Sequence, residues 1–140
     1  MVVVLSWLFG LSVPSTAVGR DLVVIVHPAS TIEELGRAEL IHLFLGRQRR
    51  LPGGQRALVI DLVGPGDEKR LFYARLVGKD LAEIQSYWAR LVFTGRGSAP
   101  WQAESVDELL DLVHSNPGAI GYLDEANVDH RARVVFRLTP

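Results

Sequence analysis

The amino-acid sequence predicts a single compact α/β domain in which a mixed sheet is flanked by helices. Two nearly continuous apolar runs, Leu22–Val26 and residues 57–63, are typical of strands that are covered on both faces. Apolar residues recur at helical spacing in several later segments, and strands and helices alternate without repeats or low-complexity linkers. This alternation indicates one layered α/β unit.

The first half of the chain is expected to begin with the strand Leu22–Val26, followed by a helical region. Thr31 and Glu34 form a capping-box pattern that predicts the start of this region, and Gly46 suits the left-handed turn that closes it. Gly36 leaves two short helices as an alternative to one unbroken helix.

The rest of the chain is expected to alternate in the same way. A turn at residues 52–54 precedes the second strand, after which Asp67 is expected to cap a helix that ends at Gly78. Two further helices are expected from capping boxes at residues 80–83 and 105–108, and two short strands at residues 119–123 and 134–136.

The composition excludes several classes of protein. The 140 residues include 15 Lys and Arg, 16 Asp and Glu, and no Cys. A nearly balanced charge argues against broad nucleic-acid binding and polybasic membrane binding, since both need a dominant positive field. Without Cys there are no disulfides, thiol nucleophiles, iron–sulfur clusters or Cys-built zinc sites.

Residues 1–19 contain no charged side chain, and Arg20 is the first. Residues 2–13 form an apolar stretch of the length found in secretory signal peptides, and small residues follow it, so we expect cleavage after Gly19 or Ala17. The basic residue that usually opens a signal peptide is missing, and a buried N-terminal strand is the alternative interpretation. The expected mature domain is residues 20–140.

No pattern in the sequence indicates catalysis, a metal site or a cofactor site. None of the four histidines (His27, His42, His114 and His130) lies three or four residues from another, as a helical metal-binding pair would. There is no nucleophile motif around a serine and no glycine-rich nucleotide-binding motif. We therefore expect a protein that is not an enzyme and that uses neither a metal nor a cofactor.

Two segments are candidates for binding an anion. In Thr94-Gly95-Arg96-Gly97-Ser98, glycines flank an arginine, so backbone N–H groups and a guanidinium could converge on an oxyanion. The segment 46–50 carries three arginines in four residues. Spacing alone favours a structural loop in the first case and a solvated surface turn in the second.

Two tryptophans suit the walls of a cleft. Trp88 and Trp101 are both large, flat side chains, although the helical spacing around Trp88 favours a place in the core.

The order of four segments resembles the periplasmic substrate-binding proteins of phosphate ABC transporters, especially their short relatives. These segments are VVIVHP, ELIHLFLGR, YWARLVFTGRG and PGAIGY, at residues 23–28, 39–47, 87–97 and 117–122. The resemblance implies one lobe of a type II periplasmic-binding-protein fold and a periplasmic location. It also implies phosphate or another small oxyanion as ligand, and a transporter or sensor in the inner membrane as partner.

Two functions follow from this resemblance. The first is a secreted, non-catalytic binding protein that holds a small anion near Thr94–Ser98 and near the helix start at Gly66 and Asp67. The second is a ligand-free interaction or sensory module on the same scaffold. The second is favoured by the short chain, which supplies about one lobe, and by Asp67 and Glu68, whose carboxylates at a helix N-terminus would repel phosphate.

Overall fold

A mixed five-stranded sheet forms the centre of the protein. The computed structural model describes residues 21–139, so the expected signal peptide lies outside the described residues. The strands are β1 (Leu22–Val26), β2 (Leu58–Leu62), β3 (Trp101–Ala103), β4 (Ala119–Asp124) and β5 (Arg133–Leu138), in the spatial order β3-β2-β4-β1-β5. β1 runs antiparallel to β4 and β5, whereas β2 runs parallel to β3 and β4. The predicted fold class is confirmed.

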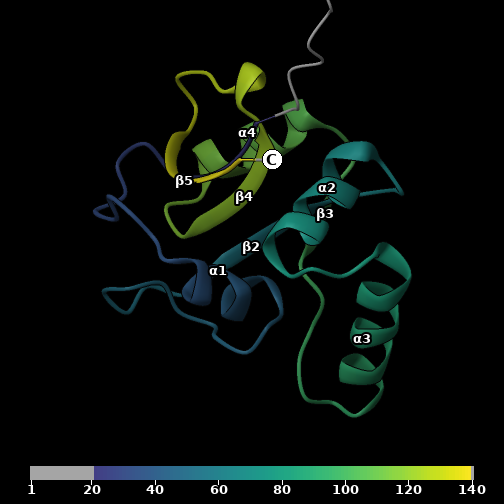
Figure 1. The fold of residues 1–140 in the computed structure, drawn as a ribbon. Coiled ribbons are helices and arrows are strands. Elements are labelled where there is room, and N and C mark those ends of the chain that lie inside the picture. Colours follow the sequence, from purple (N-terminus) through teal and green to yellow (C-terminus); the bar gives the residue numbers. More distant parts are fainter. Residues whose placement is uncertain (1–20, 140) are drawn as a thin grey trace, which may run out of the picture.

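Helices cover both faces of this sheet (Figure 1). They are α1 (Arg37–Phe44), α2 (Asp67–Leu76), α3 (Leu81–Phe93) and α4 (Val106–Ser115), with a 3₁₀ turn at Glu125–Asn127. Among residues 21–139, none of these helices is both long and apolar enough to cross a bilayer.

The two faces are distinguished by neighbouring residues of β4. Gly121 packs against Leu109 of α4, whereas Tyr122 stacks on Phe72 of α2 and meets Phe44 of α1 edge-on. Successive strand residues point to opposite faces, so α4 covers one face and α1 and α2 cover the other.

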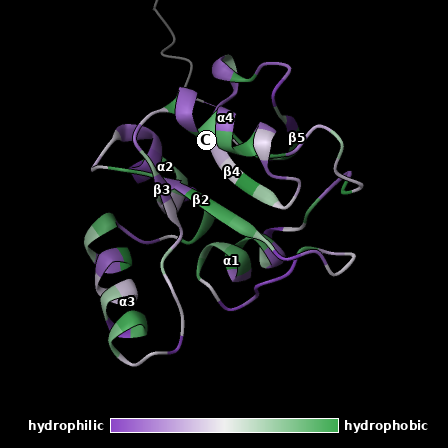
Figure 2. Cartoon of the chain, turned by 180° about the vertical axis from the view of Figure 1, so that it is seen from behind, coloured by the Kyte–Doolittle hydropathy of each residue, from purple (hydrophilic) through white to green (hydrophobic). Residues whose placement is uncertain are grey.

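Helix α3 stands to one side of the sheet (Figures 1 and 2). Of its 13 residues only Ile84 and Trp88 are buried, whereas the other helices bury three or four residues each within shorter lengths. Its Asp80–Glu83 capping box is present as predicted, with both reciprocal hydrogen bonds. Phe93 at its end is 92% exposed.

The prediction that a helix starts at Thr31 is wrong. Residues 31–36 are irregular, and α1 begins only at Arg37, with Gly36 as its N-cap. The Arg133 guanidinium donates to the carbonyls of Ser30 and Ile32, and the Leu35 N–H donates to a carbonyl of β5. These long-range hydrogen bonds use backbone groups that a helix would need.

Two smaller expectations also differ from the structure. Asp67 is the first residue of α2, whose N-cap is Gly66 without a side-chain cap, whereas Gly78 closes the helix in a left-handed conformation as expected. The strand β3 was not predicted. It is three residues long and exists through parallel pairing with β2, which no local pattern of three residues can reveal.

A buried carboxylate links the sheet to α2. Asp61 of β2 is 3% exposed, and its Oδ2 accepts a 2.7 Å hydrogen bond from the Tyr73 hydroxyl. Its Oδ1 accepts from the Tyr122 hydroxyl of β4, and the Lys69 Nζ lies 3.6 Å from Oδ2. We call these four residues the Asp61 cluster. A buried charge is tolerated only when it is paired and hydrogen-bonded, as it is here.

The substitution Asp61→Ala is expected to lower the free energy of unfolding by about 3–5 kcal/mol, because it leaves the buried ammonium of Lys69 and two hydroxyls without their partner. Urea unfolding measures the loss. Asp67→Ala is the control: it removes an exposed carboxylate six residues away and should change stability by less than about 1 kcal/mol. Equal losses in the two variants would contradict a special role for the Asp61 cluster.

Alkaline pH is expected to destabilise the fold through the same cluster. Burial, and then the Asp61 carboxylate, raise the pKa of Tyr73 and of Tyr122 well above the ordinary value. An unfolded tyrosine loses its proton above about pH 10 while the folded ones keep theirs. This contribution to stability is therefore complete below about pH 10 and declines as the pH rises further.

Tyrosinate absorbance during an alkaline titration provides the test. In a Tyr87→Phe variant, Tyr73 and Tyr122 are the two remaining tyrosines, so ionisation should coincide with loss of far-ultraviolet circular dichroism. Ionisation of both tyrosines with the fold intact would refute the prediction.

Candidate ligand site

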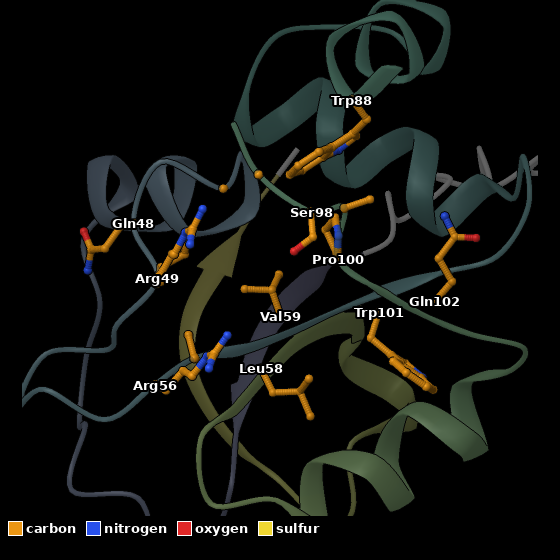
Figure 3. Close-up of a pocket in the computed structure, with 15 residues that line it drawn as sticks. Gln48, Arg49, Arg56, Leu58, Val59, Trp88, Ser98, Pro100, Trp101 and Gln102 are labelled. Carbon is orange, nitrogen blue, oxygen red and sulfur yellow. The ribbon is translucent and has the colours of Figure 1, made fainter. Parts of the chain in front are cut away.

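A cavity of about 750 Å³ lies at the N-terminal end of β2 (Figure 3). Its lining residues come from the end of α1 and the loop that follows, from the start of β2, from Trp88 of α3, and from residues 97–102. It therefore joins two parts of the sequence, residues 43–59 and residues 88–102. Both segments considered as anion sites from the sequence, 46–50 and 94–98, contribute to it.

A short hairpin places Arg49 and Arg56 in the wall of this cavity. The Ala57 N–H donates to the Arg49 carbonyl over 2.9 Å, and Arg50 pairs with Arg56 in an antiparallel bridge. Residues 52–54 form the tip, where both glycines have positive φ angles that other residues rarely adopt. The residues at 49 and 56 thus lie on adjacent strands of one ribbon.

Close packing behind the hairpin fixes the position of Arg56. The Gly118 carbonyl accepts a 2.9 Å hydrogen bond from the Leu58 N–H, and a Cβ added at Gly118 would collide with the Arg56 carbonyl oxygen. The turn at Pro117 and Gly118 therefore lets the chain after Arg56 pass directly alongside the start of β4.

The cavity has an unbalanced positive charge. Within residues 21–139 the Arg49 and Arg56 guanidinium groups have no hydrogen-bond or ion-pair partner, and no carboxylate lines the cavity. Arg50, between them in the hairpin, instead donates to the Gly54 carbonyl over 2.7 Å. Unpaired guanidinium groups are suited to an oxyanion, which they can bind through two parallel N–H···O bonds.

The two tryptophans proposed as cleft walls both line this cavity. Trp88 is 9% exposed, so it also belongs to the core, and its ring packs against Gly46. No hydrogen-bond partner of the Trp88 indole Nε1–H exists among the described residues. Trp101 is 58% exposed at the sheet edge.

The five residues of the predicted loop divide into two groups. Gly97 and Ser98 line the cavity. Thr94, Gly95 and Arg96 end α3: their N–H groups donate to helix carbonyls at distances of 3.0–3.1 Å. These N–H groups are therefore engaged within the protein, and the Arg96 side chain does not line the cavity.

The other predicted site residues lie beyond the opposite end of β2. Gly66 and Asp67 follow the last residue of that strand, whereas the cavity lies at its first two residues. Asp67 pairs with Arg70 over 3.3 Å, and the Glu68 carboxylate accepts a hydrogen bond from the Asp124 N–H. The structure does not bring the two predicted parts into one cavity, and anion binding at Gly66 and Asp67 stays a prediction.

Sequence analysis did not identify Arg56 or Gln102 as lining residues. The turn at residues 52–54 was the available signal for Arg56, because a hairpin at this turn pairs residues 49–50 with 56–57. Gln102 belongs to the unpredicted strand β3.

A second cavity, of about 690 Å³, lies along α3 and differs in charge. Arg47, Lys79 and Arg90 line it together with Asp80 and Glu83, so acidic groups accompany the basic ones. It is less suited to an anion than the first cavity.

Three histidines that the sequence did not connect lie close together. The His27 and His114 rings stack with centroids 6.0 Å apart, and the His130 ring lies 6.2 Å from that of His114. In the described part of the chain, no group of three or more potential ligands is arranged to hold a metal ion.

Comparison with known proteins shows a likeness in fold. No protein-family model and no curated protein sequence matches the chain. Solved structures that match include an ABC-type phosphate transport receptor from Vibrio cholerae, with 14% identity and a TM-score of 0.66. A putative phosphate ABC transporter substrate-binding protein with bound phosphate from Clostridium perfringens matches with 16% sequence identity and a TM-score of 0.66. PstS from Borrelia burgdorferi matches with 13% sequence identity and a TM-score of 0.62.

Each of these matches covers 83% of the chain but only 45%, 44% and 47% of the respective structure. The chain thus spans less than half the length of the proteins that it matches. Its fold is that of one lobe of a periplasmic binding protein.

Replacing Gly46 by Ala is expected to destabilise the protein more than the same change at Gly78. Both glycines end a helix with similar φ angles of +70° and +74°, so each substitution carries left-handed strain of about 1–2 kcal/mol. Only at Gly46 would the new Cβ lie 3.0 Å from the Trp88 ring, which adds about 1 kcal/mol or more. Chemical unfolding measures the loss of stability in both variants. Equal losses of unfolding free energy would contradict the prediction, because they would show that the Trp88 ring can move away from the new Cβ at no energetic cost.

Proposed function

We propose that this protein is a non-catalytic, substrate-binding-protein-like domain that binds an oxyanion such as phosphate in the cavity at the start of β2. Residues 1–19 act as a signal peptide in this proposal, and the domain works in the periplasm with an inner-membrane transporter or sensor. The likeness in fold to a phosphate transport receptor and to a putative substrate-binding protein with bound phosphate supports this class of function.

One observation carries the proposal: Arg49 and Arg56, unpaired within the described residues, line a cavity that contains no carboxylate. The Ser98 hydroxyl adds a neutral hydrogen-bond donor to the lining, whereas the Gln48 amide already donates to the Arg50 carbonyl over 2.7 Å. Such a set of donors can bind the oxygens of an anion. It contains no negatively charged group that a cation would need.

The start of α2 is a weaker candidate for the anion. The Asp67 and Glu68 carboxylates occupy its first turn, where they stabilise the helix and oppose a second negative charge. Asp61, which is buried directly before this turn, adds a third carboxylate that already uses the nearby hydroxyls of Tyr73 and Tyr122. We therefore favour the arginine-lined cavity over Gly66 and Asp67.

A second candidate function is a ligand-free interaction or sensory module. The exposure of Val92 and Phe93 at the end of α3, at 52% and 92%, favours it, because large apolar side chains on a surface often mark a contact with another protein. Under this alternative the arginines would contact an acidic partner, and small oxyanions would not bind.

Titration calorimetry with phosphate and with sulfate tests the first function. Binding is expected, and Arg49→Gln and Arg56→Gln should each weaken it about tenfold or more, because a charge-assisted hydrogen bond contributes about 1.5–3 kcal/mol. Arg50→Gln is the matched control: it removes an equal charge from the same hairpin but outside the cavity, and should leave affinity nearly unchanged.

Absence of heat at millimolar phosphate and sulfate would count against the first function and leave the interaction module. An equal effect of all three arginine variants would show that the general positive charge of the hairpin, and not this cavity, attracts the anion.

A further inference from the structure

The cavity is much larger than a bare oxyanion requires. Its volume of about 750 Å³ falls in the range of about 300–1,000 Å³ that is typical of sites enclosing organic ligands of substantial size. A tetrahedral ion held by Arg49 and Arg56 would leave most of this space without contacts. The dimensions therefore point to a ligand with a body beyond its anionic group.

Charge and apolar surface occupy different sides of the cavity. Figure 3 shows Arg49 and Arg56 on one side and Trp101 on the other, with Val59 and Pro100 between them. Among the described residues that line the cavity, the two arginines are the only charged ones. A ligand that fits this arrangement is charged at one end only.

Apart from Gln48, Ser98 and Gln102, the other residues of the walls are apolar, and some present flat rings. Figure 3 shows Ser98 and Pro100 between Trp88 and Val59, and the half-exposed Trp101 continues the surface away from the arginines. Aromatic rings prefer to stack on flat apolar partners, and such contacts exceed what buried area alone contributes.

Two guanidinium groups favour a doubly charged group over a singly charged one. A phosphate monoester carries about −1.5 to −2 charges at pH 7 and three acceptor oxygens, so it can neutralise both arginines at once. A carboxylate supplies one charge and would leave one of the two guanidinium groups without a counter-charge. The anionic end is therefore best matched by a phosphate monoester.

We infer that the cavity takes an organic phosphate monoester with a flat apolar body, the phosphate at Arg49 and Arg56 and the body along Val59, Trp88 and Trp101. This inference rests on the proposed function and narrows its ligand class. It makes Trp101 a determinant of ligand specificity. The Trp101 ring contacts the organic part of the ligand, and the two arginines bind its phosphate group.

Titration calorimetry of the purified chain with phenyl phosphate, inorganic phosphate and benzyl alcohol tests this inference. Phenyl phosphate is expected to bind at least tenfold more tightly than inorganic phosphate, and benzyl alcohol, which lacks the charge, to bind more weakly than phenyl phosphate. Trp101→Ala should weaken phenyl phosphate binding severalfold and inorganic phosphate binding by a clearly smaller factor. Phe93→Ala, which removes an exposed aromatic ring outside the cavity, should affect neither.

The outcomes separate the two levels of the proposal. If inorganic phosphate binds as tightly as phenyl phosphate, the organic-body inference is overturned while the oxyanion-binding function stands. If neither phosphate compound binds, the proposed function itself fails and the inference with it. Equal binding of benzyl alcohol and phenyl phosphate would also overturn both, because the arginines would then contribute nothing.

Discussion

The hydrogen-bonded carboxylate of Asp61 connects most of the structure. It lies in β2, receives the hydroxyls of Tyr73 from α2 and Tyr122 from β4, and has Lys69 of α2 as its counter-charge. Three elements must therefore be correctly placed before any of these polar groups is satisfied. A purely apolar contact would tolerate sliding of α2 along the sheet, whereas directional hydrogen bonds to a buried charge do not.

This connection also explains where a ligand can and cannot be accommodated. At the C-terminal end of β2 the polar side chains are paired with one another, and the first turn of α2 adds further carboxylates. At the N-terminal end of the same strand, the hairpin supplies guanidinium groups without partners in the described chain. The two ends of β2 thus differ in charge. At its C-terminal end the charged side chains are paired within the protein, whereas at its N-terminal end two guanidinium groups lack a partner in the described chain.

The parts of the fold that follow from local sequence were predicted correctly. β1 is a continuous apolar run of five fully buried residues, and the capping box at Asp80 and Glu83 forms because both partners lie in one helical turn. The segment 31–36 has a capping pattern as well, but Arg133, about a hundred residues later, binds the carbonyls of Ser30 and Ile32. β3 likewise depends on its partner strand. Contacts of this kind are invisible in a local pattern.

The candidate site shows the same division. The arginine-rich turn at residues 46–50 and the loop Thr94–Ser98 were predicted as separate anion-binding candidates, each weak alone, and only Gly97 and Ser98 of that loop line the cavity. Only the structure shows that they line one cavity, because their proximity depends on how α1 and α3 pack beside β2. Arg56 belongs to the site through its antiparallel pairing with Arg50, which the turn glycines favour but do not specify.

The close approach at Gly118 makes this position a remote determinant of the site. Gly118 does not line the cavity, yet any side chain there would push against the backbone of Arg56 and shift its guanidinium relative to that of Arg49. The spacing between the two charges is thus set partly by a residue in a turn more than sixty positions later. In descendants of this sequence, a change at that turn would alter the geometry of the proposed anion site without altering a single residue that lines the cavity.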